Sequence, residues 1–293
     1  MKIEMCVSVP NGGFNFIELM SKTINRTISG LHEISLRFTC HDSSQESMIK
    51  DSCNGISISG SHIIERTQNN FIHSNSVTHS RCIETMYQAT QADVCLICDY
   101  DCIPVRKNWD EEIARQINKE NVILLGSPYS ELPLNLYGGV PAYKYQRQPN
   151  AIFLAINLLK YREVTPSLCR FSHTFDDPAS MPLKLISTPL EASQFGLDIG
   201  QFLNIDTGSL IPEVIAKNQL KTKLLERKIT DYKVISLNSG DLSPFLAPEE
   251  YYLDGELFSV HFRKAGSVST KPNSYGFYQF KADIENYLDK LNI

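Results

Sequence analysis

The chain has 293 residues, of which 42% are hydrophobic and 21% charged, and its net charge is −5. This composition is ordinary for a globular enzyme and excludes a disordered chain. The acidic balance argues against nucleic-acid binding through overall charge, although a local basic patch remains compatible with it. No apolar run approaches the roughly 18 residues that cross a bilayer, and the start of the sequence lacks a signal-peptide pattern. We therefore expect a cytoplasmic protein without a membrane span.

The eight cysteines are scattered, and several lie in apolar, strand-like contexts. Cys95 and Cys98 fall within one predicted strand, where residues three apart face opposite sides. A zinc ion or redox pair shared by these two thiols is therefore not expected. We expect reduced, mostly buried thiols, which fits a reducing compartment.

Strand-like and helix-like patterns alternate over the first 126 residues. This alternation is typical of an α/β fold whose mainly parallel sheet is covered by helices. The segment from His41 to Ile64 reads as a polar turn and then a Gly/Ser-rich stretch. The patterns predict strands at 3–9, 33–40, 92–101 and 122–125, and helices from Phe14 to Ile24, over 77–91 and after Asn108.

The second half is less regular. Residues 127–150 are rich in Pro, Tyr and Gly and read as long loops rather than as a linker between domains. We therefore expect a single domain over residues 1–293, without internal repeats. The patterns predict strands at 151–156, 234–237 and 257–262, a helix after Pro212, and a closing amphipathic helix that begins near Phe280.

The run from Ala92 to Asp101 is the most informative motif. It is apolar and ends in Asp99 and Asp101. Residues i and i+2 of a strand point the same way, so these carboxylates should project together from the carboxyl end of a strand. Ligands bind at that edge of open α/β sheets, and paired carboxylates suit a hard divalent cation. The alternative is an Asp-rich turn without a ligand.

The order of motifs resembles the GT-A glycosyltransferases. Pro10 follows the first strand, Asp42 follows the second, and the Asp-x-Asp pair ends a later apolar strand. The resemblance implies a GT-A-like fold with a nucleotide-sugar half (1–126), an acceptor half (127–270) and a C-terminal helical tail (271–293). It also implies Mn²⁺ or Mg²⁺ as cofactor and a nucleoside-diphosphate sugar, most simply a uridine one, as donor.

The resemblance also assigns roles to individual residues. Asp101 and His261 would bind the metal, while Asp99, deeper in the site, would hold the ribose or a metal-bound water and counts as a further metal ligand. The remaining donor-binding candidates are Pro10, Asp42, Asn75, His79, Arg81, Arg263, Lys264 and Ser267. The catalytic base of an inverting reaction would be Asp206, which begins an Asp-Thr-Gly turn, or Asp198, with Glu191 as a rival.

The acceptor stays open. A basic stretch over residues 217–233 predicts either a solvated face or contact with a phosphate-bearing acceptor such as DNA, and a glycan is the other candidate. Two other functions compete with glycosyl transfer. One is a Mg²⁺-dependent nucleotidyltransferase, although Pro10 to Phe14 has glycines without a nearby cation. The other is a non-catalytic carbohydrate- or partner-binding protein on the same fold.

Overall fold

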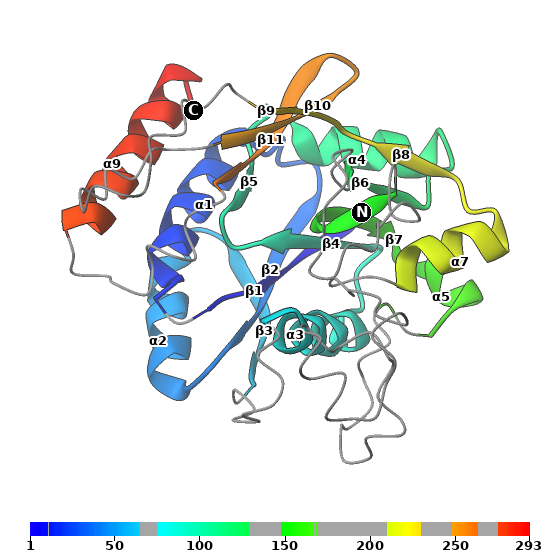
Figure 1. Cartoon of the computed structure of the whole chain (residues 1–293), viewed down its shortest axis with the longest axis horizontal. Helices are drawn as coiled ribbons and strands as arrows, with labels where there is room; N and C mark the ends of the chain where they lie inside the picture. Colours follow the sequence, from blue (N-terminus) through cyan, green and yellow to red (C-terminus); the bar gives the residue numbers. More distant parts are fainter. Residues whose placement is uncertain are drawn as a thin grey trace, which may run out of the picture.

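A mainly parallel sheet with helices on both faces forms the centre of the molecule (Figure 1). The computed structural model describes residues 1–10, 12–64, 75–128, 148–166, 168, 210–229, 248–262 and 275–293. The described helices are α1 (Phe14–Thr27), α2 (Ser43–Ser52), α3 (Asn75–Ala89), α4 (Trp109–Asn118), α5 (Leu158–Val164), α7 (Leu210–Asn218) and α9 (Tyr275–Lys290).

The described strands form two sheets. The central sheet has the order β3-β2-β1-β4-β7-β6-β8, and β7 runs antiparallel to both of its neighbours. Its strands are β1 (Lys2–Ser8), β2 (Glu33–Cys40), β3 (Ser57–Ile63), β4 (Val94–Asp99), β6 (Leu124–Pro128), β7 (Pro149–Asn157) and β8 (Thr222–Leu224). The predicted class, an α/β fold with a mainly parallel, helix-covered sheet, is confirmed.

The second sheet is antiparallel, with the order β5-β11-β10-β9. Its strands are β5 (Cys102–Pro104), β9 (Glu226–Ile229), β10 (Pro248–Leu253) and β11 (Glu256–Phe262). Strand β5 comes three residues after β4, so this sheet begins where a strand of the central sheet ends. The strand predicted at 257–262 is confirmed, and the one predicted at 234–237 lies outside the described residues.

Residues of the central sheet alternate between two hydrophobic clusters, one on each face. Val94, Leu96 and Cys98 of β4 belong to the cluster that also contains α1 and α4 side chains. Cys95 and Ile97 belong to the cluster that contains α3 and α7 side chains. The two thiols therefore face opposite sides, as predicted. Seven cysteines within the described ranges are buried and free.

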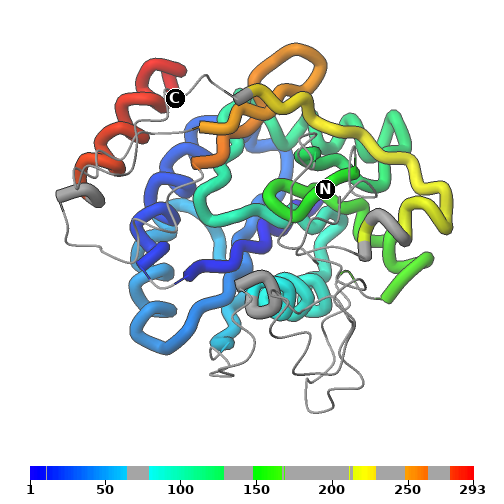
Figure 2. Tube along the Cα trace, in the orientation of Figure 1, coloured from blue at the N-terminus to red at the C-terminus, as the bar shows by residue number. Residues whose placement is uncertain are grey.

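The C-terminal helix α9 packs beside α1, although the two are far apart in the sequence (Figures 1 and 2). The Phe280 and Phe16 rings pack edge to face with their centroids 5.9 Å apart, and the Lys281 Nζ lies 3.2 Å from the Glu18 Oε2. The predicted closing helix is confirmed, and it begins at Tyr275 rather than near Phe280. It joins the same core as β1 and β11.

The segment from His41 to Ile64, predicted as a polar turn and a Gly/Ser-rich stretch, instead contains α2 and β3. Asp42 caps the start of α2 by accepting a hydrogen bond from the Gln45 backbone N–H at 2.8 Å. Only Gln45 and Ile49 of this helix are buried, so its sequence carries almost no helical apolar pattern. The cap and the solvent-facing Glu46–Lys50 pair support it instead.

No helix among the described residues is long and apolar enough to cross a membrane.

Candidate metal and nucleotide-sugar site

Asp99, Asp101 and His261 come together at one end of the central sheet. One ligand atom from each of these side chains lies within 4.8 Å of the others. No other group of three or more such side chains within the described ranges is arranged in this way. The sequence predicted these three residues as a cluster, although 160 positions separate Asp101 from His261.

Parallel pairing of β1 with β4 places Asp99 beside Ser8, at the carboxyl end of both strands. The structure corrects one step of the prediction, because β4 ends at Asp99 and Asp101 lies in the turn before β5. Alternation along one strand is therefore not what joins the two acids. The turn brings Asp101 against β11, where its carbonyl accepts a hydrogen bond from the Phe262 N–H at 2.8 Å.

Burial of the two acids is the reverse of the prediction. The Asp101 side chain is 7% exposed and that of Asp99 is 22% exposed, so Asp101 is the deeper acid. The β5–β11 pairing, which the sequence did not predict, covers Asp101. Asp99 instead faces α3, where the His79 Nε2 lies 3.3 Å from its Oδ1. His79 was predicted to bind the nucleotide sugar, and that role stays a prediction.

His261 lies between two buried carboxylates. Its Nε2 is 3.4 Å from the Asp101 Oδ1, and its Nδ1 is 3.2 Å from the Glu249 Oε2. Glu249 also accepts a hydrogen bond from the Tyr251 hydroxyl at 2.9 Å and pairs with the Arg227 guanidinium. Glu249 is the site residue that the sequence reasoning missed. Asp254-Gly255, a dipeptide typical of a tight hairpin turn, signals the hairpin but not the register that pairs Glu249 with His261.

The electrostatics of this cluster favour a positive charge. Burial lowers the pKa of His261, but the nearby Asp101 and Glu249 outweigh it and hold that pKa well above the ordinary value. Burial raises the pKa of Asp101, and the negative charge of Asp99 raises it further. The facing imidazole lowers it, but not enough to cancel the increase. A buried carboxylate is stabilised when a cation or a proton lies beside it. Two carboxylates and an imidazole therefore suit a divalent cation.

The predicted nucleoside side lies at the same sheet edge. Pro10 follows β1 and Asp42 follows the neighbouring parallel strand β2. The Gln45 side chain donates to the Pro10 carbonyl at 2.7 Å, which joins the two turns. Asp42 is the helix cap described above. Arg81 is half-buried on α3.

Other predicted residues cannot be placed. For Asn75 only the backbone is described, as the first residue of α3. Trp109 of α4, by contrast, is fully buried and belongs to the core. The remaining candidates lie outside the described residues: Asp198, Asp206, Arg263, Lys264, Ser267 and the rival base Glu191.

The predicted basic stretch does not form one free cationic face over its described part. Lys223 pairs with Asp254 at 2.8 Å, and Lys228 lies 3.9 Å from the centre of the Tyr252 ring. Arg227 pairs with Glu249, and the Lys221 ammonium donates to a backbone carbonyl. These cations therefore hold β8, β9 and their neighbours together.

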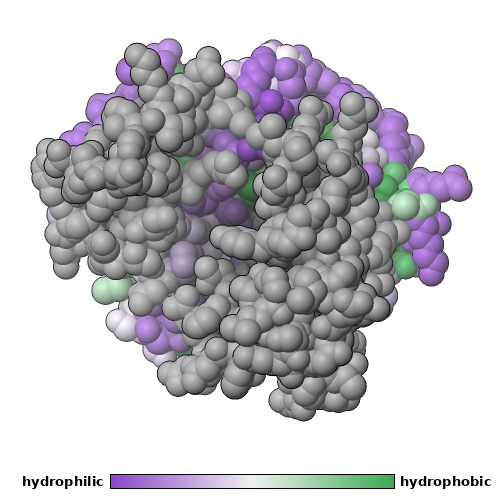
Figure 3. Space-filling view, viewed as in Figure 1, coloured by the Kyte–Doolittle hydropathy of each residue, from purple (hydrophilic) through white to green (hydrophobic). Residues whose placement is uncertain are grey.

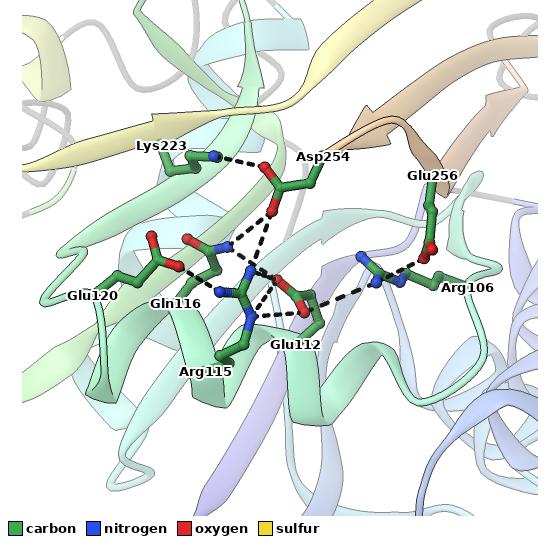
Figure 4. A network of polar contacts seen from close by, with 8 residues as sticks. All are labelled: Arg106, Glu112, Arg115, Gln116, Glu120, Lys223, Asp254 and Glu256. Atoms are coloured by element: carbon green, nitrogen blue, oxygen red, sulfur yellow. Dashed lines mark hydrogen bonds and ion pairs between the residues drawn. The ribbon is translucent and has the colours of Figure 1, made fainter.

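The turn of the β10–β11 hairpin is fixed to α4 by a polar network (Figure 4). The Arg115 guanidinium contacts Glu112, Glu120 and Asp254, and Arg106 pairs with Glu256 at 2.7 Å. These contacts hold the hairpin whose second strand carries His261.

The described surface over α9 and this hairpin is mostly hydrophilic in Figure 3. A depression of about 540 Å³ beside the network is lined by Arg106 and Arg115, away from the acid–imidazole cluster.

No protein-family model and no curated protein sequence matches the chain. Solved structures do. Mouse xyloside xylosyltransferase 1, in its apo form, has 10% identity and a TM-score of 0.45, with 77% of this chain and 86% of that chain covered. The mannosyltransferase PcManGT from Pyrobaculum calidifontis, in complex with GDP-Man and Mn²⁺, has 9% identity and a TM-score of 0.40, with 70% and 54% covered.

S. aureus TarS 1–349 in complex with UDP has 13% identity and a TM-score of 0.38, and the match covers 56% of this chain. The chain spans about half of the length of the TarS 1–349 structures that it matches. Because these identities and TM-scores are low, no substrate and no residue role can be transferred from these proteins to this chain. Its function therefore has to be inferred from its own residues.

Proposed function

We propose that this protein is a metal-dependent glycosyltransferase that moves a sugar from a nucleoside-diphosphate sugar, specifically a uridine one, to an acceptor hydroxyl. The observation that carries the proposal is the cluster of Asp99, Asp101 and His261 at the edge of the central sheet where the parallel strands β1 and β4 end. Open α/β sheets bind ligands at that edge. The order of motifs along the chain, from Pro10 to His261, supports the same assignment.

Asp101 and His261 would hold the divalent cation, with Asp99 as a further ligand or as a partner of the ribose. Carboxylate oxygens suit Mg²⁺ and Mn²⁺ alike. The imidazole favours Mn²⁺, since Mg²⁺ is bound chiefly through carboxylates, phosphates and water. When bound, such a cation stabilises the negative charge that develops on a departing diphosphate.

The protein's own groups would orient the donor around this centre. His79 contacts Asp99 and limits how that carboxylate turns. Pro10 and Asp42 would line the nucleoside, together with Asn75 and Arg81 on α3. We assign Arg263, Lys264 and Ser267 to the diphosphate, because cations and hydroxyls that follow the strand of His261 would lie near a metal-bound phosphate.

An inverting reaction would need a base to take the proton of the acceptor hydroxyl, and Asp206 or Asp198 is proposed for it. We propose a glycan rather than DNA as acceptor. The charge pairing of Arg227 and Lys223 with buried or structural acids leaves these cations poorly placed for phosphates. A cytoplasmic location is supported by the free, buried thiols of the described residues, which are typical of a reducing compartment.

The test is turnover. UDP-sugars incubated with the full chain and Mn²⁺ should release UDP by transfer or slow hydrolysis, and Asp101→Asn should abolish it. Asp93→Asn is the matched control, because Asp93 lies just before the opposite end of β4, where its carboxylate accepts a hydrogen bond from the Lys2 N–H at 2.8 Å. Its turnover should equal that of the wild type.

The competing functions give other results. A nucleotidyltransferase would instead release pyrophosphate from a nucleoside triphosphate in an Asp101-dependent reaction. A binding protein would show a thermal shift with a sugar nucleotide and Mn²⁺ without any turnover. Either result contradicts the proposal, as does equal turnover in wild type and Asp101→Asn.

A further inference from the structure

We propose that Glu249 is the positioning residue for His261. Its carboxylate accepts a hydrogen bond from the Nδ1–H group of the imidazole and so leaves the Nε2 lone pair free for a divalent cation beside Asp101. This inference rests on the proposed function, because it deepens the metal centre assigned there. It gives Glu249, which no sequence motif pointed to, a defined role that acts through another residue.

The two ring nitrogens of His261 face two different acids. Nδ1 lies 3.2 Å from the Glu249 Oε2, and Nε2 lies 3.4 Å from the Asp101 Oδ1. An imidazole with one proton donates from one nitrogen and offers a lone pair from the other. A proton on Nδ1 is therefore what makes Nε2 the ligand atom, on the side where Asp101 and Asp99 lie. Metal-binding histidines commonly donate their other N–H to a carboxylate in this way.

The partners of Glu249 hold its carboxylate in place. Its side chain is 2% exposed, and a buried carboxylate is tolerated only where charged or hydrogen-bonding partners satisfy it. The Arg227 guanidinium pairs with its Oε1, and the Tyr251 hydroxyl donates to its Oε2 at 2.9 Å. Both partners come from β9 and β10, so the carboxylate cannot turn away from the imidazole without losing them.

The register of the hairpin brings Glu249 and His261 together. The turn pairs Leu253 with Glu256, but the pairing shifts by one residue at Tyr251 and Tyr252. This shift leaves Phe258 as the extra residue of β11, whose carbonyl accepts the Val105 N–H at 2.9 Å. Without the shift Glu249 would oppose Val260. A one-residue slip moves side chains to the other face, so this bulge is what makes the contact.

The affinity of the protein for Mn²⁺, measured without any sugar nucleotide, shows whether Glu249 orients His261 or only supports the fold. Glu249→Gln keeps the size of the side chain, removes its charge, and can donate to Nδ1, which moves the proton to Nε2. We expect the Mn²⁺ affinity of Glu249→Gln to be about 10- to 100-fold lower than that of the wild type. Calorimetry, or EPR of the free ion, measures this affinity. Glu250→Gln is the matched control. Glu250 is on the same strand and accepts from Tyr252 and Tyr287, so its substitution should leave Mn²⁺ affinity unchanged.

Asp101→Asn separates the claim that the site binds a metal from the claim that Glu249 positions His261. If it weakens Mn²⁺ binding and Glu249→Gln binds like the wild type, the positioning role is overturned and the metal centre stands. If Asp101→Asn binds Mn²⁺ like the wild type, or the wild type binds none, the metal centre fails and the positioning role with it. Equal weakening in Glu249→Gln and Glu250→Gln would mean a general loss of strand structure and would also overturn the positioning role.

A second measurement on the wild type avoids any folding defect of a variant. In ¹⁵N-labelled protein loaded with Zn²⁺, a diamagnetic ion that imidazole nitrogen binds well, two-bond ¹H–¹⁵N correlation spectra report which ring nitrogen of His261 carries the proton. We expect the proton on Nδ1 and none on Nε2. A proton on Nε2 in the loaded protein overturns the proposal.

Discussion

Glu4 and Arg37 form a buried ion pair between β1 and β2, next to the strand that ends at the candidate site. The Glu4 Oε1 lies 2.5 Å from the Arg37 Nε, and the two side chains are 6% and 12% exposed. Burial raises the pKa of Glu4, but the hydrogen bonds from Arg37, Ser59 and Thr90 outweigh it, so the net pKa is lowered. The perturbation that we consider is Glu4→Gln, which removes the charge and keeps the shape.

The expected loss of unfolding free energy at pH 7 is about 3–5 kcal/mol, because the variant leaves the Arg37 guanidinium buried without its counter-charge. A carboxyl whose pKa is lowered on folding contributes stability that is present above its unfolded pKa of about 4.3. That contribution is lost as the pH falls through the folded pKa. Below that pKa Glu4 is neutral, as Gln is, so the difference between the two proteins should shrink.

Urea unfolding of wild type and Glu4→Gln at intervals between pH 3 and pH 7 is the assay. Glu33→Gln is the control, because Glu33 pairs with Lys2 on the same two strands at 3.5 Å, with both side chains about two-thirds exposed. The Glu33 variant should differ from the wild type by less than about 1 kcal/mol at every pH. A Glu4→Gln effect that is independent of pH, or no larger than that of Glu33→Gln, would refute this reasoning.

Three further substitutions test the packing around the site. Gly126→Ala would place a Cβ 2.9 Å from the Phe153 carbonyl oxygen, so urea unfolding should give a loss of about 1–3 kcal/mol, and no loss would contradict that fit. Trp109→Ala should cost about 3–5 kcal/mol as a core truncation, whereas a surface stacking residue would cost far less. Arg115→Met should speed amide exchange around Asp254 with little global destabilisation, and unchanged exchange would mean that the turn does not need this contact.

The sequence predicts the central sheet well because its signals are local and strong. The run that ends at Asp99 is apolar, and its residues are buried on both faces, as expected for a parallel strand. Helix α2 was missed because a cap at Asp42 and surface pairs support it, and neither produces apolar periodicity.

The candidate site was predicted in part. Asp99, Asp101 and His261 follow from strand ends and motif order, and the structure brings them together. The order of burial of the two acids was wrong, because it depends on the pairing of β5 with β11, a non-local contact that no local pattern encodes. Glu249 could not be predicted for a similar reason, because a single bulge decides its partner. The single-domain organisation over residues 1–293 stays a prediction.

The central claim is a divalent cation held by Asp101 and His261, with Asp99 beside them. A crystal of the full chain soaked with Mn²⁺ and UDP, measured near the manganese absorption edge, tests it most directly. We expect one anomalous peak in contact with the Asp101 carboxylate and the His261 Nε2, with the diphosphate oxygens of UDP next to it. A peak away from these side chains, or UDP bound with no peak at this cluster, would contradict the claim.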